Sequence, residues 1–133
     1  MVVKAIRNKS WFAYFPEDYR WSFNVVAAMA GASDIGEIDQ ICRRLMRNVG
    51  NDGLWFREWI RMADRLRKSA LSEERRGNAL SAASFHKRAS NYYQMGDRFR
   101  FPKDKKALDA YRLSIDSFKR YARLTDRPRI EVL

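Results

Sequence analysis

The chain has 133 residues, of which 46% are hydrophobic and 32% are charged, and its formal net charge is +11. These values predict one globular domain with its own core and exclude a disordered tail, while the basic excess favours anionic partners. A single cysteine excludes an internal disulfide, and the lack of a secretory signal or a membrane-length apolar run predicts a soluble, cytoplasmic chain.

Two helices are predicted in the N-terminal part, after a short extended segment. Residues 10–19 alternate in the way typical of a strand. The first helix is expected over residues 17–31, with acidic residues in its first turn and a glycine at its end. The second helix is capped by Ser33 or Asp34, and Asp34 stands before Glu37 at the spacing of a capping box.

A helical hairpin is predicted over residues 51–99. Asp52 is the expected N-cap of its first helix, Gly77 and Asn78 are expected to end that helix, and Ser81 is expected to cap the second. The apolar face of the first helix consists of Trp55, Trp59, Met62, Leu66 and Ala70. Small residues recur at every seventh position of the second helix, at Ala82, Ala89 and Gly96. Such a row predicts close approach of a neighbouring helix.

A fifth helix is predicted to begin at Pro102, where a proline suits the first turn. Its apolar stripe consists of Ala107, Tyr111, Ile115, Phe118 and Ala122. Residues 129–133 then alternate like the beginning of a strand, which needs partner strands to be stable. The elements together predict an all-α fold: about five helices in an antiparallel array around the hairpin, with a short C-terminal strand stub.

The basic residues are dispersed, and many alternate with acids as on solvated helix faces. The densest stretch is residues 98–106, RFRFPKDKK, which has two interpretations. Nucleic-acid bases could stack on Phe99 and Phe101 while the cations hold phosphates. The preferred interpretation is a helix–loop–helix corner with both phenylalanines tucked inward.

Three stretches resemble the helical N-terminal region of one branch of the α/β-hydrolases. That branch includes the 2,6-dihydroxypseudooxynicotine hydrolase and the fungal polyketide-shortening hydrolases of pigment synthesis. The stretches are residues 31–45 (GASDIGEIDQICRRL), 51–66 (NDGLWFREWIRMADRL) and 77–93 (GNALSAASFHKRASNYY). The second has a W-x3-W-x3-A pattern, and the third has Arg-Ala-Ser before a tyrosine pair. The end of the chain, RPRIEVL, is similar to the entry into the first strand of the hydrolase sheet.

The resemblance implies a helical cap that packs over a catalytic α/β domain C-terminal to this chain, closes the substrate pocket and often joins a homodimer contact. It divides the chain into an N-terminal extended arm (residues 1–16), a cap domain (17–126) and a linker into the first strand of the missing domain (127–133). The parent protein would be a serine hydrolase that cleaves an ester or a C–C bond of a ketone- or polyketide-like substrate.

The chain itself offers few groups for chemistry. It has one histidine and one cysteine, which cannot form a usual metal site, and it contains no G-x-S-x-G, G-x-G-x-x-G or phosphate-binding loop. Cys42 stands among apolar residues and is predicted to be a buried, inert thiol. We therefore predict no catalytic residue, no metal and no cofactor.

Five residues are candidates for the wall of a substrate pocket under the cap: Trp55, Trp59, His86, Tyr92 and Tyr93. The alternative role, which we prefer for the histidine and the tryptophans, is ordinary packing and hydrogen bonding in the core. Two other functions remain open for the whole chain. It could be a stand-alone helical protein-interaction module, or a basic nucleic-acid-binding domain, although nucleic acid is the less expected partner.

Overall fold

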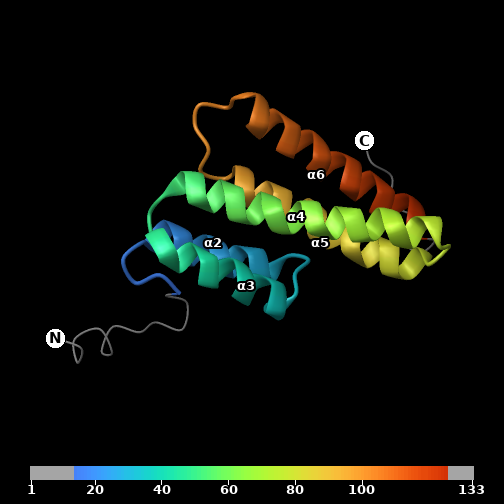
Figure 1. The fold of residues 1–133 in the computed structure, drawn as a ribbon, viewed down its shortest axis with the longest axis horizontal. Coiled ribbons are helices and arrows are strands. Elements are labelled where there is room, and N and C mark those ends of the chain that lie inside the picture. Colours follow the sequence, from blue (N-terminus) through green and yellow to red (C-terminus); the bar gives the residue numbers. More distant parts are fainter. Residues whose placement is uncertain (1–13, 126–133) are drawn as a thin grey trace.

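The computed structural model describes residues 14–125, and within them all regular structure is helical (Figure 1). The elements are α2 (Tyr19–Ala30), α3 (Ile35–Leu45), a short 3-10 turn (Met46–Asn48), α4 (Asp52–Arg75), α5 (Ala79–Asp97) and α6 (Lys105–Leu124). This confirms the all-α class. None of the described helices is both long and apolar enough to cross a membrane.

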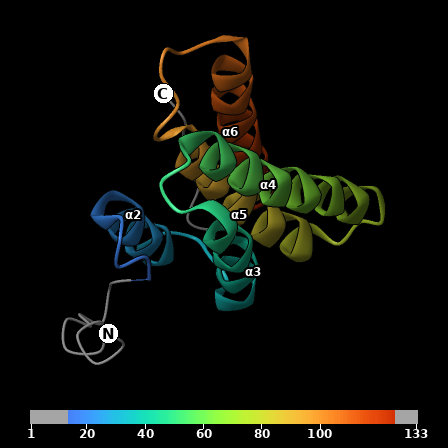
Figure 2. The same cartoon turned by 60° about the vertical axis from the view of Figure 1, so that its left-hand side comes forward.

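Helices α4 and α5 form a long antiparallel hairpin, and α6 runs back along α5 on the other side (Figures 1 and 2). The shorter helices α2 and α3 pack beside the hairpin, where α3 contacts α4 and α2 contacts α5. The strand predicted over residues 10–19 is wrong for its described part, because residues 14–18 form bends and a turn. Residues 10–13 and the predicted strand stub lie outside the described residues.

The observed N-caps of α3 and α4 agree only partly with the sequence prediction. Asp34 caps α3 as predicted, since its carboxylate accepts a hydrogen bond from the Glu37 N–H at 3.1 Å. The α4 cap is Asn51, whose side chain accepts from the Leu54 N–H at 2.9 Å. Asp52, predicted for that place, instead binds residues of α2.

The two later helix starts also differ from the prediction. Helix α5 begins before Ser81, directly after the turn at Gly77, whose φ of 80° is one that glycine adopts readily. Helix α6 begins after Pro102, because Asp104 accepts a hydrogen bond from the Ala107 N–H at 3.1 Å and thereby sets the first turn.

The α4–α5 interface pairs large aromatic rings with small residues. The Trp55 and Trp59 rings lie 5.3 Å apart, and the Trp59 ring meets Tyr92 at 5.6 Å. A β-carbon at Gly96 would lie 2.8 Å from Ile60 Cδ1 and 3.2 Å from Trp59 Cβ. Gly96 therefore permits the close approach that the row of small residues predicts.

Helix α6 buries only part of its predicted face. The residues of α6 that lie buried are Ala107, Ala110, Ser114, Ser117 and Ala122. Tyr111 and Phe118 are 57% and 36% exposed, so the prediction of a buried Tyr111/Phe118 stripe is wrong. Small side chains let α6 approach α5 so closely that Ser90 and Ser114 exchange hydrogen bonds with each other's backbone carbonyls, at 2.9 and 3.1 Å.

Candidate functional site

All five predicted pocket residues are fully buried, with no exposed surface on Trp55, Trp59, His86, Tyr92 or Tyr93. The structure brings the two tryptophans and Tyr92 into one aromatic cluster, whereas the polar groups of Tyr92, Tyr93 and His86 have separate partners. None of the five lines the hollows described below. Their role in a substrate pocket therefore stays a prediction, and their observed role is packing.

Tyr92 joins three helices. Its hydroxyl donates to Glu37 Oε1 at 2.9 Å and accepts from the Asp34 N–H at 3.0 Å, while Arg88 Nε donates to the same Glu37 oxygen at 2.9 Å. Its ring meanwhile packs on Trp59 of α4. Burial raises the pKa of Tyr92, so the hydroxyl is kept neutral as a donor. Tyr92 thus brings Glu37 of α3 and Trp59 of α4 into one contact.

Tyr93 faces the other way, and its hydroxyl donates to Asp64 Oδ1 at 2.6 Å. The tryptophans are also unequal in their polar contacts. Trp55 Nε1 donates to the Met95 carbonyl at 2.7 Å, whereas Trp59 Nε1 is buried with no hydrogen-bond partner among the described residues.

His86 belongs to a polar network between α4, α5 and α6. Its Nε2 lies 2.6 Å from Glu74 Oε1, and Arg120 donates to the second Glu74 oxygen at 3.1 Å. Arg67 continues the network with an ion pair to Asp116 at 2.7 Å. Burial lowers the pKa of His86, and nearby Arg67 and Arg120 lower it further, against the opposite effect of Glu74. The neutral imidazole therefore fits this network best.

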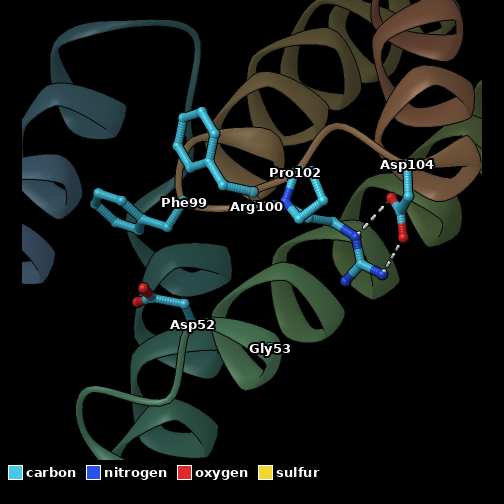
Figure 3. Close-up of a pocket in the computed structure, with 7 residues that line it drawn as sticks. Asp52, Gly53, Phe99, Arg100, Pro102 and Asp104 are labelled. Carbon is cyan, nitrogen blue, oxygen red and sulfur yellow. Dashed lines mark hydrogen bonds and ion pairs between the residues drawn. The ribbon is translucent and has the colours of Figure 1, made fainter.

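Two adjoining hollows lie between the first half of α4 and the chain that connects α5 to α6. The larger, here named the α4 groove, has a volume of about 490 Å³ and is lined by Phe56, Arg57, Ile60, Arg61, Asp64 and Lys106. The smaller, the loop hollow, has a volume of about 290 Å³ and is lined by Asp52, Phe99, Phe101, Pro102 and Asp104 (Figure 3). Gly53 and Arg100 belong to both linings, so the hollows adjoin each other.

The buried carboxylate of Glu58 lies near three arginines, two of which line the α4 groove. Glu58 is almost fully buried, and Arg44, Arg57 and Arg61 approach it at 3.6, 3.7 and 3.4 Å. Three guanidinium groups around one carboxylate leave two positive charges in excess. Arg100 lies over the Phe56 ring, with its central carbon 4.3 Å from the ring centroid. Cations on an apolar floor are the chemistry of an anion-binding surface.

Of the two phenylalanines in residues 98–106, one agrees with the preferred interpretation and the other does not. Phe99 does turn inward and packs on the Trp55 ring at 5.1 Å. Phe101 is 76% exposed, with Lys103 Nζ 4.6 Å from its ring centroid, so the inward prediction is wrong for this residue. Sequence reasoning did not join this stretch to Arg57 and Arg61. Their spacing of one helical turn was the available signal, but the loop that faces them lies about forty residues further along the chain.

The remaining reactive groups are ordinary. Cys42 is buried as predicted, and burial raises the pKa of its thiol to about 12, which makes it a poor nucleophile. Within residues 14–125 no group of three or more histidine, cysteine or carboxylate side chains is arranged to hold a metal ion.

Comparison of the chain with protein-family models, curated proteins and solved structures found no match.

Proposed function

We propose that this chain is the helical cap of a serine α/β-hydrolase whose catalytic domain lies C-terminal to it. The observation that carries the proposal is an exposed apolar strip on α6. The small residues of this helix pack on α5, while Leu108, Tyr111 and Phe118 are exposed. Tyr111 and Phe118 lie at helical spacing between the buried Ala107 and Ala122, so the strip borders the buried face of α6. An exposed apolar strip is typical of a contact with a partner, and we propose that the catalytic domain covers it as a second layer.

The family resemblance supplies the identity of that second layer. Glu37, Trp59 and Tyr92 come from the three resembling stretches, and Tyr92 contacts both of the others. These three residues pack together. Their packing explains why such a motif occurs in a region without catalytic groups. This supports a scaffold role for the motif. The proposed substrate remains an ester or a ketone- or polyketide-like compound with a cleavable C–C bond, and a homodimer contact remains a prediction.

In this proposal the chain contributes shape and water exclusion, and the catalytic domain contributes the nucleophile. A serine at a strand–helix elbow would attack the substrate carbonyl, with a histidine and an acid as its partners. His86 does not serve as that base, because its imidazole is buried against Glu74 and no serine hydroxyl contacts its Nδ1 among the described residues. The cap would close over the acyl or ketone part of the substrate.

The test uses the complete polypeptide that the gene encodes beside the 133-residue chain. Both are treated with a serine-directed fluorophosphonate probe and assayed with a 4-nitrophenyl ester. We expect labelling at a serine beyond residue 133 and ester hydrolysis by the complete polypeptide alone. A complete polypeptide that ends at Leu133, or that reacts with neither reagent, would contradict the proposal.

A further inference from the structure

We propose that the α4 groove and the loop hollow together bind single-stranded nucleic acid, with phosphates in the groove and a base on Phe101. This inference is independent of the proposed hydrolase cap. The site lies on the α4 side of the molecule, and it uses none of the three exposed apolar residues of α6.

The acids that line the two hollows already have partners. Asp52 accepts hydrogen bonds from Arg20 and from the Trp21 indole, and Asp104 accepts two from Arg100 and one from a backbone N–H. Asp64 accepts from the buried Tyr93 hydroxyl. Arginines therefore offset the charges of Asp52 and Asp104. Asp64 keeps its negative charge, because its donor is a neutral hydroxyl, but Arg57, Arg61 and Lys106 outnumber it in the α4 groove.

Three cations of the groove are less closely paired. Arg57 and Arg61 form ion pairs with buried Glu58 only at 3.7 and 3.4 Å, outside good hydrogen-bond geometry, and both are exposed. Lys106 is exposed and has no ion pair with a described residue. Arg57 and Arg61 stand one helical turn apart, so they lie on the same side of α4. The groove thus presents exposed donors to a ligand, and phosphate oxygens suit the arginine fork.

The exposed ring of Phe101 favours nucleic acid over other polyanions as the ligand. Its ring is exposed at the edge of the loop hollow, and the ammonium group of Lys103 lies close to it. A phosphate needs no aromatic partner, whereas an unpaired base stacks on one. A duplex hides its base faces, and an acidic peptide has none. An exposed ring next to a groove of exposed cations therefore favours a single strand.

The experiment measures the binding of a labelled oligothymidylate of about 12 nucleotides to the 133-residue chain by fluorescence anisotropy, at several salt concentrations. The groove variant is Arg57→Gln/Arg61→Gln/Lys106→Gln. Its control is Arg75→Gln/Lys119→Gln/Arg123→Gln, which removes the same charge from exposed positions near the opposite ends of α4 and α6. Thermal unfolding checks that every variant is folded.

The groove variant is expected to bind at least about tenfold more weakly and to lower the slope of log affinity against log salt by about 2, as the loss of three phosphate contacts requires. The control variant should stay within about threefold of the parent chain. Phe101→Ala should weaken binding about fivefold or more at an unchanged salt slope, because stacking is not ionic.

Three results would overturn the proposal. Equal weakening by the two charge variants would show diffuse attraction to a basic protein. Equal competition by a poly-glutamate peptide of matched charge would assign the site to acidic protein segments. Equal competition by free thymidine monophosphate, at the same phosphate concentration, would assign it to mononucleotides.

Discussion

Helix α5 has two long interfaces, and they are built on different principles. Toward α4 it meets stacked rings, with Trp59 against Tyr92 and Gly96 making room for the contact. Toward α6 it meets small side chains, and Ser90 and Ser114 bond each other's backbone. The first interface is stabilised by apolar area, and the second by close approach and hydrogen bonds.

The difference shows when an apolar stripe predicts the buried face of a helix. In α4 the large apolar residues lie in the core, so the stripe and the interface coincide. In α6 the large residues Tyr111 and Phe118 point outward, while serines and alanines are buried. Size and hydrophobicity therefore fail as guides where two helices approach closely through small side chains.

The largest effect is expected at the ring interface. Trp59→Ala should lower the free energy of unfolding by about 3–5 kcal/mol, because it empties a fully buried site in contact with Trp55 and Tyr92. Urea unfolding followed by circular dichroism measures this. Phe23→Ala, at an exposed ring on α2, is the control. A loss of less than about 1 kcal/mol for Trp59→Ala would contradict the view that apolar area stabilises the α4–α5 interface.

At the small-residue interface, adding volume should be harmful. Ser114→Leu should lower the free energy of unfolding by about 1–3 kcal/mol, because the larger side chain separates α5 from α6 and removes the bond to the Ser90 carbonyl. Ser81→Leu, the same change at an exposed position of α5, is the control. If both changes are equally tolerated in urea unfolding, close approach is not what holds α6 in place.

A smaller, pH-dependent effect is expected where the two interfaces meet at His86. Burial lowers the folded-state pKa of this imidazole, so the folded state disfavours the proton. The resulting stability is complete above the ordinary histidine pKa of about 6.5 and is lost as the pH falls through that value toward the folded pKa, by at most about 1.4 kcal/mol per pH unit.

Urea unfolding between pH 7.5 and 5 measures this dependence, and His86→Gln should flatten it because the chain has no other histidine. A parent chain that becomes more stable as the pH falls through 6.5 would contradict the lowered pKa.

The smallest effect is expected on the outer face of α6. Tyr111→Ser should change the free energy of unfolding of the isolated chain by less than about 0.5 kcal/mol, apart from the weak helix preference of serine. A loss above about 1.5 kcal/mol would show that Tyr111 already packs on part of the same chain.

Local sequence predicted what is decided locally. The turn at Gly77 and the Asp34 cap depend on residues within one helical turn, and both were predicted. Asp52 was assigned as a cap because the sequence does not reveal that Arg20 and Trp21 of α2 compete for its carboxylate. Asn51, one residue earlier, provides the cap instead.

Prediction of the candidate site from the sequence has the same limit, because the site depends on long-range contacts. Phe101 and the cations Arg57 and Arg61 were noted in the sequence, but as unconnected features, and Phe101 was predicted to turn inward. Only the return of the chain at Arg100, which lines both hollows, places them in adjoining hollows. The candidate pocket residues were recognised as inward-facing, yet pattern alone could not distinguish a cavity wall from a filled core.

The central claim is that the outer face of α6 belongs to an interface with a further domain. The most direct measurement is the labelling rate of a cysteine introduced by Tyr111→Cys, compared between the 133-residue chain and the complete polypeptide that the gene encodes. Cys42 should react slowly in this experiment, because its thiol is buried and burial also raises its pKa. Ile35→Cys, at a position 78% exposed on α3, is the control. We predict rapid labelling at residue 111 in the short chain and at least about tenfold slower labelling in the complete polypeptide, with the control unchanged. Equal rates at residue 111 in the two would contradict the claim.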